Sequence, residues 1–250
     1  MSEQRETEPQ TESGPRRLSP GSPEWAARLD ELRDLTPTPR RAALIRLAGA
    51  VRDVIERMVH VDASVEEIEA AADLAEQLRE LLGEHDAVSV YESFAEAANA
   101  GEPLGFFDHS PMLGRANPLA PPIELRLESD RVVGRVVFGS AYEGPPGSVH
   151  GGYIAAAFDE VLGSAQSLGG APGMTGRLTV HYRSPTPLHE ELRFEGVLES
   201  VRGRKILTKG TLHHGDRLCA EAEGLFISVD FSRFAEMIAA REERQASPDT

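Results

Sequence analysis

The segment from Tyr153 to Leu168 is almost wholly apolar, and it constrains the fold more than any other part of the chain. It is too long for a strand, so we expect a helix that is buried nearly all round. A single flat sheet covers only one face of such a helix. The chain must therefore supply a curved sheet that wraps around it.

Strand-like patterns with alternating polarity lie on both sides of this segment. Two precede it, joined by a Ser-Asp turn, and four follow it, with Gly203 and Gly215 in two of the turns. One helix cannot provide the crossovers that a parallel sheet needs, so we predict an α+β fold with an antiparallel curved sheet. The six predicted strands span about 123–128, 131–138, 174–183, 189–201, 204–214 and 217–229.

Composition divides the chain into four parts. Residues 1–23 are polar and rich in Pro, Ser, Glu and Arg, and we expect a disordered lead-in. Residues 24–100 form a helical N-terminal region, and residues 101–230 form the main domain, which opens on a loop rich in Gly and Pro. A C-terminal helix and tail occupy 231–250.

Two helices are predicted in the N-terminal region. Apolar residues recur at helical spacing from Arg40 to about Met58. Ser64 and Glu67 form a capping box that opens a second helix, which ends at Gly83. The acidic faces of these helices are typical of a solvated surface, and an interaction arm is the alternative.

The charge balance excludes one class of function. The 250 residues contain 26 Lys and Arg against 41 Asp and Glu, a formal net charge of −15, so a general nucleic-acid binder is excluded. The single cysteine, Cys219, cannot form an internal disulfide. The N-terminus lacks the apolar stretch of a signal peptide, and no apolar run is long enough to span a membrane. We therefore expect a cytoplasmic protein.

Asp159 is the residue that packing alone does not explain. It stands inside the apolar segment between Phe158 and Glu160, and an ionised carboxylate loses several kcal/mol of hydration when it is buried unpaired. Either the helix has a wet side on which Asp159 and Glu160 meet solvent, or Asp159 lines a cavity and takes part in chemistry.

His150, Gly151 and Gly152 stand at the start of the same helix. Adjacent glycines let a ligand approach the backbone, and the first helical turn offers unpaired N–H groups that suit a developing oxyanion. A plain Gly-rich helix start is the alternative. His150 and Asp159 are nine positions apart, about 13 Å along the axis, so one chain cannot bring both to one bond. A shared site would need a homodimer, or a dimer of dimers.

The sequence from Glu143 to Asp159 resembles the signature of hotdog-fold acyl-CoA thioesterases, in the branch that contains the phenylacetate-pathway (PaaI-like) and mitochondrial long-chain enzymes. Further similarity lies in Met174 to Pro187, in Gly203-Arg204-Lys205 and in Gly224 to Ile227. The resemblance covers about 105–230, and it implies a hotdog fold with an N-terminal helical extension. It also implies a hydrolase of lipid metabolism that acts on acyl-CoA.

The resemblance also implies roles for single residues. Asp159 falls on the catalytic carboxylate, as general base or as nucleophile, and Thr175 on a hydroxyl residue that orients the attacking water. The N–H of Gly151, with that of Gly152, would polarise the thioester carbonyl, while His150 shapes the start of the helix. The residues that would hold the CoA nucleotide and its phosphates are His181, Arg183, Arg204 and Lys205.

The basic residues suggest the same ligand without the resemblance. The chain has two lysines, Lys205 and Lys209, on one face of a strand, and a local basic patch on an acidic protein suits a polyanion such as CoA. We expect no cofactor beyond the CoA of the substrate and no metal site, because His213 and His214 lack a third ligand at suitable spacing. No Gly-x-Ser-x-Gly motif for a serine esterase is present.

We therefore predict a thioesterase that releases a free acid and CoA. Two alternatives remain open: a non-catalytic regulator that binds acyl-CoA, and a hotdog dehydratase, which needs a His/acid pair within one site.

Overall fold

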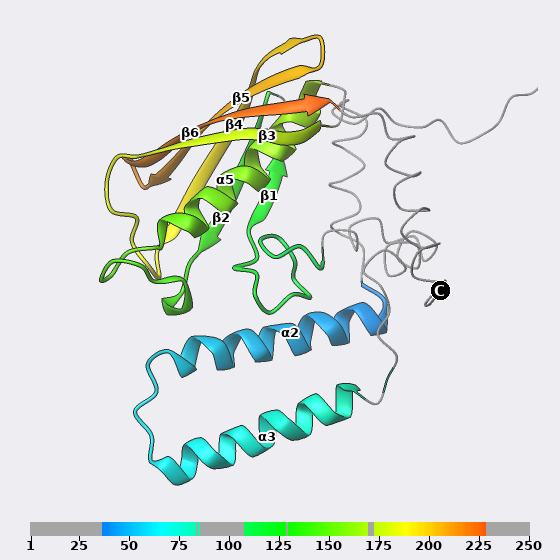
Figure 1. Ribbon diagram of the computed structural model, residues 1–250, viewed down its shortest axis with the longest axis vertical. Helices are drawn as coiled ribbons and strands as arrows, with labels where there is room; N and C mark the ends of the chain where they lie inside the picture. Colours follow the sequence, from blue (N-terminus) through cyan, green and yellow to red (C-terminus); the bar gives the residue numbers. More distant parts are fainter. Residues whose placement is uncertain (1–36, 84, 86–107, 129, 170–172, 229–250) are drawn as a thin grey trace, which may run out of the picture.

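The computed structural model describes residues 37–83, 85, 108–128, 130–169 and 173–228, and Figure 1 shows their arrangement. The predicted lead-in at 1–23 and the C-terminal helix and tail at 231–250 lie outside the described residues, as do the predicted domain limits near 24 and 101.

Two N-terminal helices form as predicted. Helix α2 spans Pro39–Met58 and helix α3 spans Val65–Gly83. The capping box is confirmed, because Ser64 N donates to Glu67 Oε2 at 2.9 Å and Glu67 N donates to Ser64 Oγ at 3.3 Å. Helix α2 lies between the sheet and α3 (Figure 1), and no residue of α3 is buried. None of the described helices is long and apolar enough to cross a membrane.

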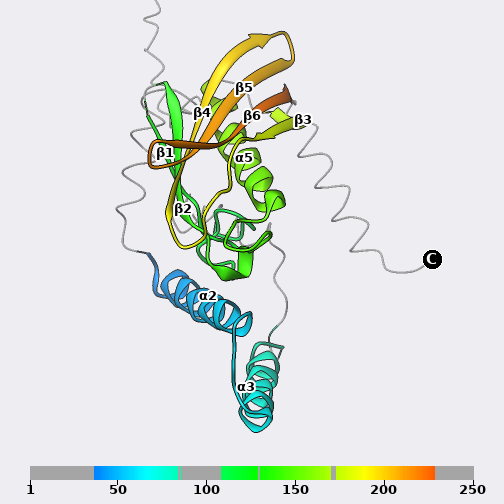
Figure 2. The ribbon, with the colours of Figure 1, turned by 90° about the vertical axis from the view of Figure 1, so that its left-hand side faces the viewer.

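Six antiparallel strands form one sheet, as the alternation patterns predict, and their order is β1-β2-β4-β5-β6-β3. The sheet wraps one side of helix α5, Gly151–Gln166 (Figures 1 and 2), which confirms the predicted fold class. The patterns did not predict the short 3-10 helix η2 at Ser140–Tyr142. The strands are β1 Glu124–Leu127, β2 Arg131–Val137, β3 Gly173–Tyr182, β4 Glu191–Arg202, β5 Lys205–His214 and β6 Arg217–Ser228.

The core lies between α5 and the inner face of the sheet. Phe158 of α5 meets Phe194 of β4 edge to face, with ring centroids 5.0 Å apart, and both side chains are fully buried. Each such ring contributes about 1.5–3 kcal/mol by leaving water. Glycine lets the helix approach the sheet, because a Cβ at Gly196 would lie 2.9 Å from Val161 Cγ1. The cysteine predicted on this sheet, Cys219, is buried as well.

One side of α5 is not covered by the sheet. Gly152, Ala156, Asp159 and Gly163 follow one another at helical spacing, and none of them is buried. The sheet ends at β3, which pairs with β6 and with no other strand among the described residues. The expectation that α5 is buried nearly all round is therefore wrong for a single chain, because the sheet stops before it closes around the helix.

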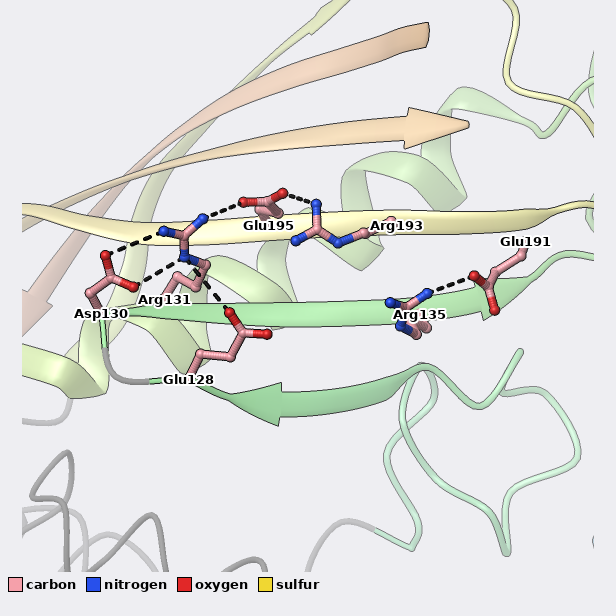
Figure 3. Close-up of polar contacts among 7 residues, drawn as sticks. All are labelled: Glu128, Asp130, Arg131, Arg135, Glu191, Arg193 and Glu195. Carbon is pink, nitrogen blue, oxygen red and sulfur yellow. Dashed lines mark hydrogen bonds and ion pairs between the residues drawn. The ribbon is translucent and has the colours of Figure 1, made fainter. Parts of the chain in front are cut away.

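The outer face of the sheet is charged where the inner face is apolar. Arg131 of β2 contacts Asp130 and Glu195 at 3.1 Å each, and Glu195 also accepts from Arg193 (Figure 3). Arg135 pairs with Glu191 at 2.6 Å across the same two strands. Such exposed pairs contribute about 0–1 kcal/mol each, so they mark the solvent side of the sheet more than they stabilise it.

Candidate functional site

Asp159 lies in the middle of the open side of α5 and is half-buried. Its Oδ1 accepts a hydrogen bond of 2.8 Å from Thr175 Oγ1, which projects from the start of β3. A hydroxyl that donates to a carboxylate keeps its lone pairs available for a water molecule. The two residues that the resemblance places side by side are therefore in contact within one chain.

A β-bulge turns Thr175 toward the helix. In the ladder with β6, Thr175 pairs with Phe226 and Arg177 pairs with Leu225, so Gly176 is an extra residue. Without it, strict alternation would put Thr175 on the same face as Arg177, away from α5. A bulge re-aims a side chain in this way. Glycine suits the position, because a Cβ at Gly176 would lie 3.2 Å from Ile227 Cγ1.

The start of α5 is fixed by contacts to its backbone. His150 is the N-cap residue, and its Nδ1 accepts from Gly152 N at 3.0 Å. Tyr182 Oη, at the other end of β3, donates to Gly151 O at 2.7 Å. A Cβ at Gly151 would lie 3.2 Å from that hydroxyl. Since the Gly152 N–H is engaged by the cap, the Gly151 N–H is the better placed donor for a ligand.

These two groups of residues lie at opposite ends of β3. Thr175 and Tyr182 are separated by most of the strand, about 23 Å at 3.3 Å per residue. The corresponding separation along α5, from Gly151 to Asp159, is about 12 Å. One chain therefore holds a carboxylate with its hydroxyl partner, and at some distance a helix terminus with backbone donors.

Comparison with known proteins assigns the chain to a family. Residues 146–222 match the thioesterase superfamily. The crystal structure of a thioesterase superfamily protein is 37% identical, with a TM-score of 0.64, over 74% of this chain and 90% of that one. The chain belongs to the thioesterase superfamily. The structural match covers a larger part of the chain than residues 146–222.

Curated relatives match a shorter part of the chain. Acyl-coenzyme A thioesterase THEM4 of Xenopus laevis is 37% identical over 93 residues, which are 36% of this chain and 42% of that protein. The protein of the same name in Bos taurus is 36% identical over 94 residues, 37% of this chain and 38% of that one. The matched part thus spans about two fifths of the length of these relatives.

A second acid, Glu160, is hydrogen-bonded to a residue that no sequence pattern pointed to. Ser110 Oγ donates to Glu160 Oε1 at 3.1 Å and accepts from the N–H groups of Met112 and Leu113 at 3.2 and 3.1 Å. Burial raises the pKa of Glu160 above its ordinary value, the Ser110 hydrogen bond lowers it, and the neighbouring Asp159 raises it again. Both acids are therefore held by hydroxyl groups, and neither simply points into solvent.

Two of the four residues predicted to bind CoA lie on the outer face of the sheet. His181 and Arg183 line a hollow of about 450 Å³ on the side away from α5. Arg183 Nε contacts Glu221 Oε2 at 2.7 Å, and Lys209, which also lines the hollow, contacts Glu199 at 2.6 Å. These cations are therefore separated by the sheet from Asp159 of the same chain.

The other two, Arg204 and Lys205, lie at the turn between β4 and β5 and are exposed. Lys205 pairs with Ile227 of β6, and the next residue pairs with Phe226, which itself pairs with Thr175. Arg204 and Lys205 thus lie at the Thr175 end of the sheet. The four predicted residues do not form one patch within one chain.

Proposed function

We propose that this chain is an acyl-CoA thioesterase that hydrolyses its substrate to a free acid and CoA. The observation that carries the proposal is the 2.8 Å hydrogen bond between Thr175 and Asp159 on the open side of a helix whose first turn presents the Gly151 N–H. The curated relatives are named acyl-coenzyme A thioesterase, which supports the substrate class.

In the proposed reaction Asp159 takes a proton from a water molecule that Thr175 holds in place. The hydroxide attacks the thioester carbonyl, and the N–H of Gly151 stabilises the oxyanion that forms. The carbon–sulfur bond then breaks, and the CoA thiolate leaves and takes up the proton. Direct attack by the Asp159 carboxylate, followed by hydrolysis of the mixed anhydride, is the variant of this scheme.

The distance between Asp159 and Gly151 supports a site that two copies share. No described strand pairs with the outer edge of β3, and the adjacent residues of α5 are small: Gly152, Ala156 and Gly163. A second copy could approach this side closely. Antiparallel pairing of two β3 edges around a twofold axis places the Tyr182 end of one copy beside the Thr175 end of the other. Gly151 of one copy then faces Asp159 of its partner.

The same arrangement gathers positive charge around the substrate. Arg204 and Lys205 lie at the Thr175 end of their own chain, and Arg183 of the second copy arrives there together with its Tyr182. Cations at that position attract the phosphates of CoA on a protein whose net charge is −15. We propose this as the nucleotide end of the site.

The activity is tested by measuring thiol release from short, long and aromatic acyl-CoAs. We expect Asp159→Asn to fold normally and to lower kcat by about 10²-fold to 10⁴-fold, the usual contribution of a general base. An unchanged kcat would exclude Asp159 from the chemistry. Tight binding of acyl-CoA without thiol release would favour a regulator, and water loss from hydroxyacyl-CoA would favour a dehydratase.

The shared site is tested by mixing two inactive chains. Asp159→Asn removes the base and Gly151→Pro removes the N–H donor, so a mixed dimer contains one site with both groups intact. Random mixing yields half mixed dimers, so we expect about a quarter of the unmutated activity per chain. A mixture that stays as inactive as its components would contradict the shared site.

A further inference from the structure

Helix α2 is held against the sheet domain by polar contacts more than by its apolar stripe. Only Ala48 of this helix is buried, whereas Val54 and Met58 are exposed. Arg41 contacts Asp108 at 2.6 Å near one end of the helix, and Glu56 contacts η2 near the other. Figures 1 and 2 show α2 beside the connecting loops at one end of the sheet domain.

The Glu56 carboxylate accepts hydrogen bonds from two successive backbone amides. Its Oε1 accepts from Ser140 N at 2.8 Å, and its Oε2 accepts from Ala141 N at 3.1 Å. These are the first amides of η2, which have no acceptor within their own turn. Gly139 lets the carboxylate approach, because a Cβ there would lie 2.4 Å from Oε2. Burial raises the pKa of Glu56, but the hydrogen bonds lower it overall.

The last residue of η2, Tyr142, connects this cap to the start of α5. Its carbonyl oxygen accepts from His150 N at 2.9 Å. Its ring packs edge to face on Tyr153, with centroids 4.9 Å apart. His150 in turn caps α5 through Gly152. The Glu56 carboxylate is therefore connected, through one short 3-10 turn and one hydrogen bond, to the residues that orient the Gly151 N–H.

We propose that Glu56 is a positioning residue that makes helix α2 part of the catalytic unit. Through η2 and Tyr142 it holds the first turn of α5 in the orientation that the oxyanion needs. The proposal rests on the proposed function, and it assigns the N-terminal helix a role in that reaction in place of a separate interaction arm.

The expected effect is on kcat more than on KM. Glu56→Ala leaves two adjacent amides without their acceptor. We expect η2 to relax, so that the Gly151 N–H no longer points toward the oxyanion. Small misplacements of a catalytic group cost up to about 10²-fold in rate, and we expect a kcat about 10-fold lower with KM within about twofold. The amide oxygen of Glu56→Gln still accepts from one N–H, so the kcat of this variant should lie between those of Glu56→Ala and the unmutated chain.

Two control variants distinguish a role of Glu56 in orienting the first turn of α5 from a role in attaching helix α2 to the sheet domain. Asp53→Asn removes an exposed acid from the same helix and should leave kcat unchanged. Arg41→Ala removes the ion pair that holds the other end of α2, about 22 Å away along the helix. If Glu56 only holds the helix in place, Arg41→Ala will lower kcat as much as Glu56→Ala. That result would overturn the proposal, as would an unchanged kcat in Glu56→Ala.

Hydrogen exchange provides a readout that does not depend on turnover. We expect Glu56→Ala to speed exchange of the backbone amides from Ser140 to Ile154, whereas Arg41→Ala and Asp53→Asn leave them protected. If the unmutated chain releases no CoA from any acyl-CoA, the proposed function fails, and this exchange pattern still decides whether Glu56 controls the start of α5. Equal protection of these amides from exchange in all variants would contradict the proposed connection between Glu56 and the start of α5.

Discussion

The two halves of the proposed site are built in different ways. At the start of α5 the functional group is a backbone N–H, and the first turn is fixed by the His150 cap, the Tyr182 hydroxyl and the packing of Tyr142 on Tyr153. Eight residues along the helix the functional group is a side chain, Asp159, whose hydrogen-bond partner among the described residues is Thr175.

The difference shows where each half is vulnerable. A backbone donor cannot be mutated away by an ordinary substitution, and several contacts share the work of orienting it. The carboxylate depends on one hydroxyl, and that hydroxyl depends on a single extra residue at Gly176. The helix terminus should therefore tolerate the loss of any one of these direct contacts better than the Asp159 half tolerates the loss of Thr175.

The N–H of Gly151 can still be removed by proline. Proline is favoured at the first helical position, and His150 already has the extended backbone (φ −60°, ψ 130°) that a following proline requires. We expect Gly151→Pro to lower kcat by about 10²-fold to 10³-fold, the cost of losing one oxyanion donor. Steady-state thiol release would measure it.

Gly151→Ala is the control, because it adds the same Cβ beside the Tyr182 ring and keeps the N–H. We expect it to retain most of the activity that proline removes. If alanine and proline lower kcat equally, crowding against Tyr182 is the cause, and the N–H donor is not part of the chemistry.

Thr175 tests the other half of the comparison. Thr175→Val keeps the shape of the side chain and removes the hydroxyl, and we expect kcat about 10-fold lower because an exposed hydrogen bond to a charged group contributes about 1.5 kcal/mol. Thr175→Ser should retain the rate of the unmutated chain within about twofold. A valine variant with full activity would remove Thr175 from the water-binding role.

Alternation and turn residues predicted the sheet closely, because each strand buries one face and exposes the other. The start of β5 is predicted at 204 and observed at Lys205, and α3 ends at Gly83 as predicted. The same alternation misleads at β3. It puts Thr175 and His181 on one face, whereas the bulge at Gly176 sends Thr175 toward Asp159 and leaves His181 on the outer face.

Contacts between segments that are far apart along the chain produce no periodic pattern in the sequence. Glu56 reaches η2 across more than eighty residues, and Ser110 reaches Glu160 across fifty. Each is one polar residue among many in an acidic chain, so neither could be distinguished from the solvated surface. Asp159 could be, because the apolar residues around it make a carboxylate conspicuous.

Substitution of the neighbouring acid, Glu160, should have the smallest effect of these changes. It should raise the stability of the folded chain, whereas the earlier substitutions lower kcat. Because its pKa is raised in the folded chain, the native state holds the proton more firmly than the unfolded state does. Its contribution to stability is present at low pH and is lost as the pH rises through the raised pKa. Glu160→Gln cannot ionise and still accepts from Ser110, so it should gain stability relative to the unmutated chain as the pH rises toward 7.

Urea unfolding at several pH values measures this difference, with Glu69→Gln on the exposed face of α3 as the control. The control should show the same pH dependence as the unmutated chain. Thiol release by Glu160→Gln should fall far less than that of Asp159→Asn, since Glu160 is turned toward the Ser110 loop. Equal losses of kcat in the two variants would mean that the adjacent acids act as one pair, and that Asp159 does not carry the chemistry alone.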